Sequence, residues 1–239
     1  MQHKLSQKKF SKSKFIIFFL LILTSFFISL FFFKIQKIDF NTKSKGFNFL
    51  GKELIIGKNL LFLNTYQLSK DISELNPKVI HLKIYKIYPN SVSITYKLDK
   101  PIAVIKANEG YLFLSGQGKI LERSKNIEKS SKLSQINYYQ KFDYLTNTTG
   151  SIIDFVDVKY SLSVLTKLKK YKNEVLSIDI SRPSMIRFNL GDSVVIFTSE
   201  KPIDEQINKL EKIILQFKVE GNNFSLLDLR FDKPVLKYK

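Results

Sequence analysis

Few residues of this 239-residue chain combine the types and the spacing that metal binding or catalysis requires. His3 and His81 are the only histidines, and cysteine is absent, so neither a zinc site of the usual Cys and His ligands nor a thiolate nucleophile can form. His81 lies on the polar side of a predicted strand, which is typical of an exposed residue. The sequence therefore predicts no metal site and no cofactor.

Carboxylates and a glycine-rich turn are the remaining candidates for chemistry. Asp154 with Asp157, and Asp228 with Asp232, are acidic pairs at close spacing, which acid–base catalysis would use only inside a pocket. The S-G-Q-G run at residues 115–118 lacks the Lys-Ser/Thr ending of a phosphate-binding loop and no helical pattern follows it, so it predicts a hairpin turn. We expect a protein that is not an enzyme, although a Ser/Lys nucleophile stays open because both residue types are abundant.

The charge of the chain limits the kinds of molecule that it is expected to bind. Lys and Arg number 39 against 21 Asp and Glu, a formal net charge of +18, but only four of the basic residues are arginines. Because lysine lacks the bidentate geometry with which arginine reads bases and phosphates, the composition argues against nucleic-acid binding. The positive charge is typical of a solvated, lysine-rich surface, and it would also favour surroundings of anionic lipid head groups or acidic wall polymers.

One segment predicts a membrane anchor. Residues 15–33 are nineteen residues without a charge, and as a helix they would span ~28 Å, close to the hydrocarbon core of a bilayer. The segment is too long, and lacks the small-residue cleavage site, for a signal peptide. By the positive-inside rule, residues 1–14 are expected in the cytoplasm and the chain after the anchor outside, because the preceding tail carries five lysines and no acidic residue: Lys4, Lys8, Lys9, Lys12 and Lys14.

Residues 35–101 predict a small α+β unit. A short strand is followed by a loop with three glycines and then by a helix over about residues 64–76, with Asn64 or Thr65 as cap and Pro77 as its end. Two alternating segments joined by a Tyr-Pro-Asn-Ser turn then predict a hairpin. The expected fold is a three-stranded sheet under one or two helices.

Residues 102–239 predict a second, mixed and β-rich domain. Short strands with Gly-containing turns, a polar loop at residues 124–134, a helix around residues 158–168 and three further strands precede a long helix between Pro202 and Gly221. The chain then ends on an alternating segment, with Leu227, Leu229 and Phe231 on one side and polar residues on the other. We expect this segment to be a strand at the edge of its sheet.

Several motifs follow one another in an order known from one family. In that family a Gly-x-Asn-Leu segment opens a module, an aromatic-Pro turn joins its long strands, and a polar, basic, Pro run leads into a β domain with two characteristic segments. The matching residues are Gly57, Asn59 and Leu60, then Tyr88-Pro89, then Asp99-Lys100-Pro101, then EGYLFLSGQGKIL and LLDLRFDKP. With its single predicted anchor, the chain thus resembles the FtsQ/DivIB family of bacterial division proteins. The resemblance implies a POTRA module of the βααββ type followed by an FtsQ-type β domain.

The resemblance also implies a function. A free sheet edge can accept a segment of another protein as an added strand. The family resemblance assigns such an edge to the C-terminal strand, where the small bitopic partners FtsB (DivIC) and FtsL would bind and be linked to septal peptidoglycan synthesis. Carried over to this chain, the expected partner-binding residues are Leu229, Arg230, Phe231, Asp232 and Lys233, together with Arg182. We expect Arg230→Glu to leave the fold intact. The competing hypotheses are a membrane-tethered wall-modifying enzyme and a basic lipid- or polymer-binding module.

Overall fold

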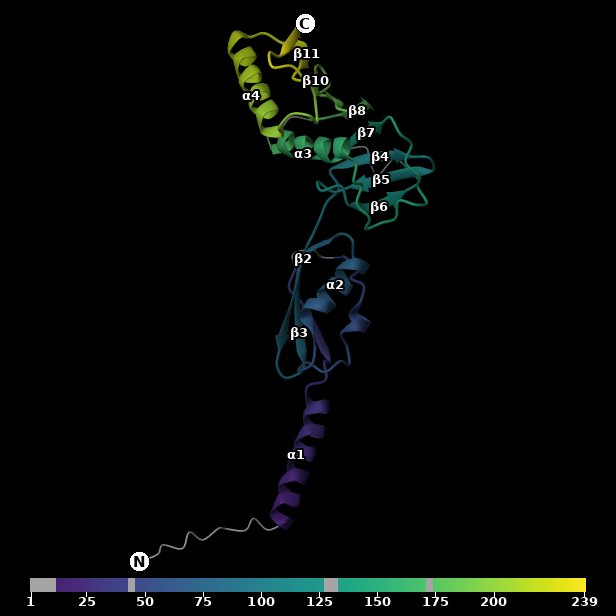
Figure 1. Ribbon diagram of the computed structural model, residues 1–239, viewed down its shortest axis with the longest axis vertical. Helices are drawn as coiled ribbons and strands as arrows, with labels where there is room; N and C mark the ends of the chain where they lie inside the picture. The colour runs from purple at the N-terminus through teal and green to yellow at the C-terminus, as the bar shows by residue number, and fades with distance from the viewer. Residues whose placement is uncertain (1–11, 43–45, 127–132, 171–173) are drawn as a thin grey trace, which may run out of the picture. The chain divides into compact units, whose positions relative to one another are not determined.

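The protein is described here by a computed structural model that covers residues 12–42, 46–126, 133–170 and 174–239 (Figure 1). The chain divides into two compact units, Met1–Lys97 and Leu98–Lys239. The fold is α+β, with one N-terminal apolar helix and a large β-sheet, as the sequence predicts.

The N-terminal helix, α1, extends over Lys12–Phe32. Its window Phe15–Phe32 has a mean hydropathy of 2.8, and at ~1.5 Å per residue its 18 residues span ~27 Å. Among the described residues α1 is the one helix long and apolar enough to cross a membrane. Three lysines of the predicted cytoplasmic tail, Lys4, Lys8 and Lys9, lie outside the described residues.

The rest of the first unit is a three-stranded sheet with the order β1-β3-β2, in which β1 pairs parallel to β3. Its elements are β1 (Lys37–Phe40), the 3-10 helix η1 (Lys52–Leu54), α2 (Thr65–Leu75), β2 (Val79–Ile87) and β3 (Ser91–Leu98). The predicted second helical segment is thus a single turn. His81 is exposed on β2, as expected, with a left-handed φ of 53°.

The buried side chains of this unit come from the expected periodicities. Val92, Ile94 and Tyr96 alternate along the central strand β3 and are buried because neighbours lie on both sides of it. Helix α2 begins at Asn64, whose side-chain oxygen accepts the N–H groups of Tyr66 and Gln67, each at 3.1 Å.

A buried amide connects the end of α2 to the loop before it. Asn76 donates to the carbonyl oxygens of Leu50, at 2.9 Å, and Ile72, at 2.8 Å, and its own oxygen accepts the N–H of Leu50 at 2.9 Å. The side chain thereby satisfies backbone groups at a helix end that has no further turn to bond.

The second unit is built on one nine-stranded mixed sheet with the order β12-β11-β10-β9-β8-β7-β4-β5-β6. Its strands are β4 (Ala103–Ala107), β5 (Gly110–Leu114), β6 (Ile120–Ser124), β7 (Ser134–Tyr138), β8 (Ser177–Arg182), β9 (Met185–Asn189), β10 (Val194–Phe197), β11 (Phe224–Asp228) and β12 (Val235–Tyr238). The sequence predicts most of these strands, but neither β7 nor β12.

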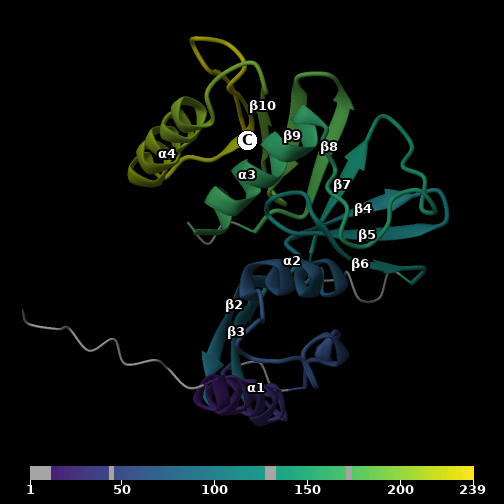
Figure 2. The ribbon, with the colours of Figure 1, turned by 60° about the horizontal axis from the view of Figure 1, so that its bottom comes forward.

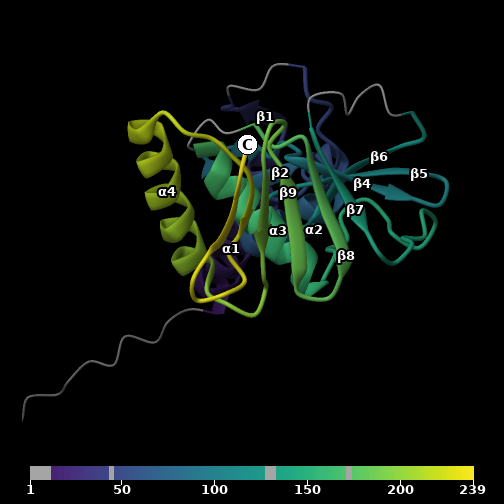
Figure 3. The ribbon, with the colours of Figure 1, turned by 90° about the horizontal axis from the view of Figure 1, so that it is seen from above.

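Two helices cover one face of this sheet, α3 (Val156–Lys170) and α4 (Ile203–Glu220) (Figures 2 and 3). They pack on a row of side chains that the strand registers align directly across five strands. The row consists of Ile136, Ile178, Phe188, Val195 and Leu227, all fully buried. Helix α4 begins after Pro202 and ends at Gly221 in a left-handed conformation, as predicted.

The S-G-Q-G run is a hairpin turn between β5 and β6, as predicted. The buried hydroxyl of Ser115 accepts the N–H groups of Gln117 and Lys119, each at 3.2 Å, and holds the turn closed. The polar loop expected at residues 124–134 falls partly outside the described residues.

We predict that Asn76→Ala destabilises the first unit by about 2–3 kcal/mol, because both backbone groups of Leu50 lose their partner. Asn64→Ala, which removes only a solvent-exposed cap, should cost about 1 kcal/mol. Hydrogen exchange of the purified chain in mild denaturant measures both variants unit by unit. Equal losses in the two variants would contradict the role assigned to Asn76.

Candidate functional site

The alternating segment near the C-terminus is not the edge of the sheet. Strand β11 pairs parallel to β10 on one side, with Val195 opposite Leu227, and antiparallel to β12 on the other, with Leu236 opposite Leu227. The prediction of a free edge at residues 226–232 is therefore wrong. The chain turns back after β11, and the last residues form the edge strand instead.

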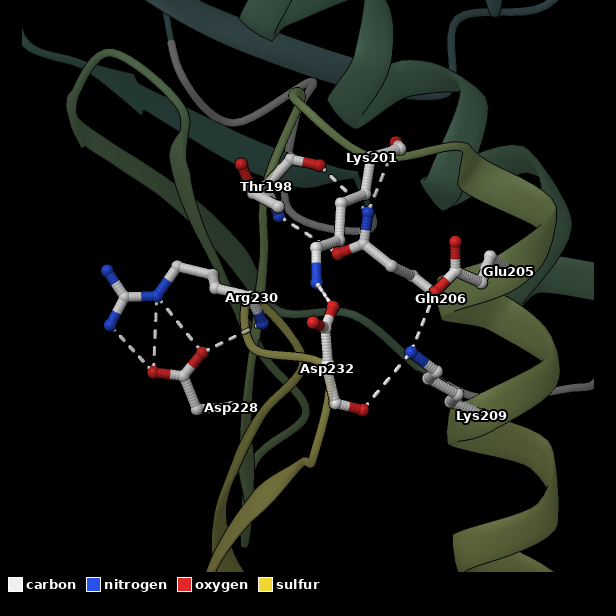
Figure 4. Close-up of polar contacts among 8 residues, drawn as sticks. All are labelled: Thr198, Lys201, Glu205, Gln206, Lys209, Asp228, Arg230 and Asp232. Atoms are coloured by element: carbon white, nitrogen blue, oxygen red, sulfur yellow. Dashed lines mark hydrogen bonds and ion pairs between the residues drawn. The ribbon is translucent and has the colours of Figure 1, made fainter.

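Strand β11 ends at Asp228 because this carboxylate binds the residue two positions ahead. Its oxygens accept the backbone N–H of Arg230 at 3.1 Å and the guanidinium at 3.0 Å (Nε) and 2.7 Å (Nη2) (Figure 4). The side chain of Asp228 is only 8% exposed, so this two-point contact balances a charge that has lost its water. The same hydrogen bonds raise the pKa of Arg230.

Of the two apolar residues that follow Asp228, one is buried and the other is exposed. Leu229 is buried, and its N–H donates to the carbonyl oxygen of Ile196 at 2.9 Å. Phe231, expected on the same side, is 52% exposed and lies beside the Arg230 guanidinium, 5.4 Å from its ring centroid. Strand alternation does not extend past Asp228, since residues 230–233 form a bend.

Lysines of the β10–α4 connection and of α4 hold this bend. The Nζ of Lys201 lies 2.6 Å from an Asp232 carboxylate oxygen, and the Nζ of Lys209 donates to the Asp232 carbonyl at 3.4 Å (Figure 4). Hydrogen bonding from Lys201 lowers the pKa of Asp232, which keeps that carboxylate charged. Glu205 binds Lys209 in turn at 2.7 Å. The bend is thereby attached to the start of α4.

A buried glutamine, which the sequence analysis missed, fixes the start of α4 itself. The amide oxygen of Gln206 accepts the N–H of Thr198 at 3.0 Å, and its nitrogen donates to the Thr198 carbonyl at 2.9 Å (Figure 4). The same nitrogen donates to the Tyr160 hydroxyl at 2.6 Å. Burial raises the pKa of Tyr160 to about 12. The signal in the sequence is a polar residue inside the apolar stripe of a predicted helix, next to Ile207.

Strand β12 is the last strand in this direction. Leu236 and Tyr238 face the helices, and the Tyr238 ring stacks on Phe217 with centroids 5.6 Å apart. Val235 and Lys237 are exposed on the opposite face. In the described part of the chain no strand pairs with the outer side of β12, where alternate residues of an edge strand direct their N–H and C=O groups.

Arg182 lies apart from this edge. It is exposed at the end of β8 that corresponds to the Asp228 end of β11, and its Nε donates to the Met185 sulfur at 3.3 Å. Three strand spacings of ~4.8 Å separate β8 from β11, a distance of ~14 Å. The structure thus brings together residues 229–233 at one corner of the sheet, but not Arg182.

The acidic pairs considered for catalysis do not converge. Asp154 forms an ion pair with Lys159, and Asp157 accepts the hydroxyl of Ser199 at 2.5 Å. Asp228 and Asp232 bind different cations, as described above. Within the described ranges no group of three or more His, Asp or Glu side chains is placed to hold a metal ion.

We predict that Arg230→Glu destabilises the second unit by about 2–4 kcal/mol, because it sets a like charge against the nearly buried Asp228. This replaces the sequence-based expectation of an intact fold. Lys233→Glu makes the same charge change at an exposed neighbour and should alter stability by less than about 0.5 kcal/mol. Urea unfolding of both variants measures the difference, and equal stabilities would contradict the role of the Asp228–Arg230 pair.

Comparison with known proteins places the chain among division proteins. No protein-family model matches it. It is 24% identical over 162 residues to the "Cell division protein DivIB" of Clostridium tetani (strain Massachusetts / E88), a match that covers 66% of this chain and 60% of that protein. It is also 24% identical over 229 residues to the proteins of the same name from Clostridium botulinum strains Loch Maree / Type A3 and Hall, covering 90% of this chain and 86% of each.

These matches agree with the resemblance inferred from the order of the motifs in the sequence. Together they support the assignment of this chain to the FtsQ/DivIB family of cell division proteins.

Proposed function

We propose that this protein is a membrane-anchored scaffold of the division complex that binds an extended segment of a partner as an added strand on the outer side of β12. The observation that carries the proposal is the position of β12 as the terminal strand of the sheet. Unpaired N–H and C=O groups along an exposed edge are satisfied when a partner strand pairs with them.

The side chains around the edge support a specific kind of segment. Val235 on β12 and Phe231 in the bend are each half exposed and offer apolar area near the edge. The neighbouring Lys233 and Lys237 are also exposed and give the edge a positive rim. Such a rim selects a partner flanked by Glu or Asp, mainly through the rate of encounter and the register of pairing.

The partners we propose are small bitopic division proteins of the FtsB (DivIC) and FtsL type, through which the scaffold would be linked to septal peptidoglycan synthesis. Residues 35–101 would serve as a POTRA module and residues 102–239 as the FtsQ-type β domain. The strand order β1-β3-β2 with α2 supports the first assignment. The lysines of residues 1–14 favour a cytoplasmic tail, with both units outside.

Binding, rather than catalysis, is the function that the site chemistry favours. At the corner around residues 228–233, Asp228 and Asp232 are each bound by a cation, so neither carboxylate is free to act on a substrate as an acid or base. A scaffold needs an ordered edge, and these pairs provide one.

Strand addition predicts a period of two in disulfide cross-linking. The chain has no cysteine, so Val235→Cys or Lys237→Cys gives a single thiol on one face of β12. With cysteines placed one at a time along the partner's extracytoplasmic segment, we expect alternate partner positions to cross-link. Cross-links every third or fourth position would indicate a bound helix, and their absence would exclude pairing at β12.

The positive rim predicts a charge effect on binding. Lys233→Glu should lower the association rate with the partner segment about tenfold at low salt, with a smaller effect at high salt. Lys106→Glu, at an exposed lysine on β4 five strands from β11, is the matched control and should leave the rate unchanged. Surface plasmon resonance at two ionic strengths measures both, and equal rates for the two variants would contradict the proposed rim.

A further inference from the structure

Hydrogen bonds from residues 59 and 60 connect the first unit to the end of α1. The side-chain amide of Asn59 donates to the carbonyl oxygen of Leu30 at 3.2 Å, and the N–H of Leu60 donates to the carbonyl of Phe33 at 2.8 Å. Both carbonyls belong to the end of the apolar helix, where no further helical turn can satisfy them. Residues 58–60 therefore lie at the depth where α1 leaves the hydrocarbon core.

Exposed apolar side chains gather next to residues 58–60, and the described part of the chain does not cover them. Leu61 follows an Asx turn, in which its N–H donates to the Asn59 side-chain oxygen at 2.9 Å, and both Leu61 and Phe62 are exposed. Ile56 and Tyr88 are exposed as well, and the Tyr88 ring lies 6.1 Å from that of Phe33. A cluster of this kind on a soluble surface would be unfavourable.

Positive charge surrounds the same cluster. Lys34 and Lys58 are exposed, and the Nζ of Lys86 donates to the Leu61 carbonyl at 3.2 Å. Residues 55–64 contain no acidic residue. Lysines that flank exposed apolar residues at the end of a spanning helix are typical of the bilayer interface, where their ammonium groups contact anionic head groups.

A groove beside α1 indicates that a second segment of the unit reaches the same level. Gln36, just before β1, and Asn90, at the β2–β3 turn, form one wall of the groove, and α1 forms the other with Phe27, Ile28, Phe31 and Phe32. The N–H of Gln36 donates to the Asn90 carbonyl at 2.9 Å, which ties the turn to the helix end. Acyl chains and head groups are the material that fills such a groove when α1 is in a bilayer.

We propose that the basal surface, defined as Ile56, Leu61, Phe62 and Tyr88 with Lys34, Lys58 and Lys86, is inserted into the interface of a membrane containing anionic lipids. The first unit then rests on the bilayer, instead of moving freely on a tether. The lipid around α1 is what contacts the basal surface. The hydrogen bonds from residues 59 and 60 to the end of α1 keep this surface at the depth of the helix end. The inference concerns a different surface from β12 and does not depend on strand addition.

Two leucines of equal exposure make a matched test. Leu61 is 40% exposed on the basal surface, and Leu75 is 43% exposed at the far end of α2, ~16 Å along that 11-residue helix. Because the chain has no cysteine, Leu61→Cys or Leu75→Cys in the full chain gives a single thiol for an environment-sensitive fluorophore. Each labelled variant is placed in nanodiscs of phosphatidylethanolamine and phosphatidylglycerol. Phe62→Cys is a second basal position in case labelling at residue 61 disturbs the turn.

We expect lipids with a nitroxide near the carbonyl end of the acyl chain to quench the labels at residues 61 and 62 about threefold or more strongly than the label at residue 75. Quenching at the two basal positions equal to that at residue 75 would overturn the proposal. Lys58→Glu should reduce quenching at residue 61 about twofold, because it places a negative charge next to anionic head groups. Unchanged quenching in that variant would overturn the part assigned to the lysines.

Discussion

The terminal corner of the large sheet depends on one buried carboxylate. Asp228 lies within β11 with almost no exposure, and a charge in that position is stable only with a partner that offers several hydrogen bonds. Arg230 supplies them from two residues ahead, which bends the chain away from the strand direction. That bend allows the last residues to return as β12 and pair with β11. The edge of the sheet is therefore a consequence of this ion pair.

The corner is also held from the helix side. Lys201 and Lys209 bind Asp232, while Gln206 fixes the start of α4 to β10 through both backbone groups of Thr198. Because the contacts connect three separate segments, the bend has little conformational freedom. A binding edge that is already ordered loses less conformational entropy on association, which favours affinity without requiring a large interface.

The two ends of the chain use apolar surface in different ways. At the base of the first unit, exposed apolar side chains lie beside lysines, and residues 55–64 contain no acidic residue, which suits a bilayer surface. Around β12, exposed apolar residues alternate with a hydrogen-bonding backbone, which suits a polypeptide.

The sequence by itself determined the apolar N-terminal helix, the helices α2 and α4 with their caps at Asn64, Pro202 and Gly221, and the hairpin β2–β3, because local periodicity and capping chemistry leave clear patterns. Only the tertiary structure decided which strand forms the edge. Pairing partners, unlike strand alternation, depend on contacts between distant residues. The break between β11 and β12 follows from the burial of Asp228 and its contact with Arg230, which no local rule shows.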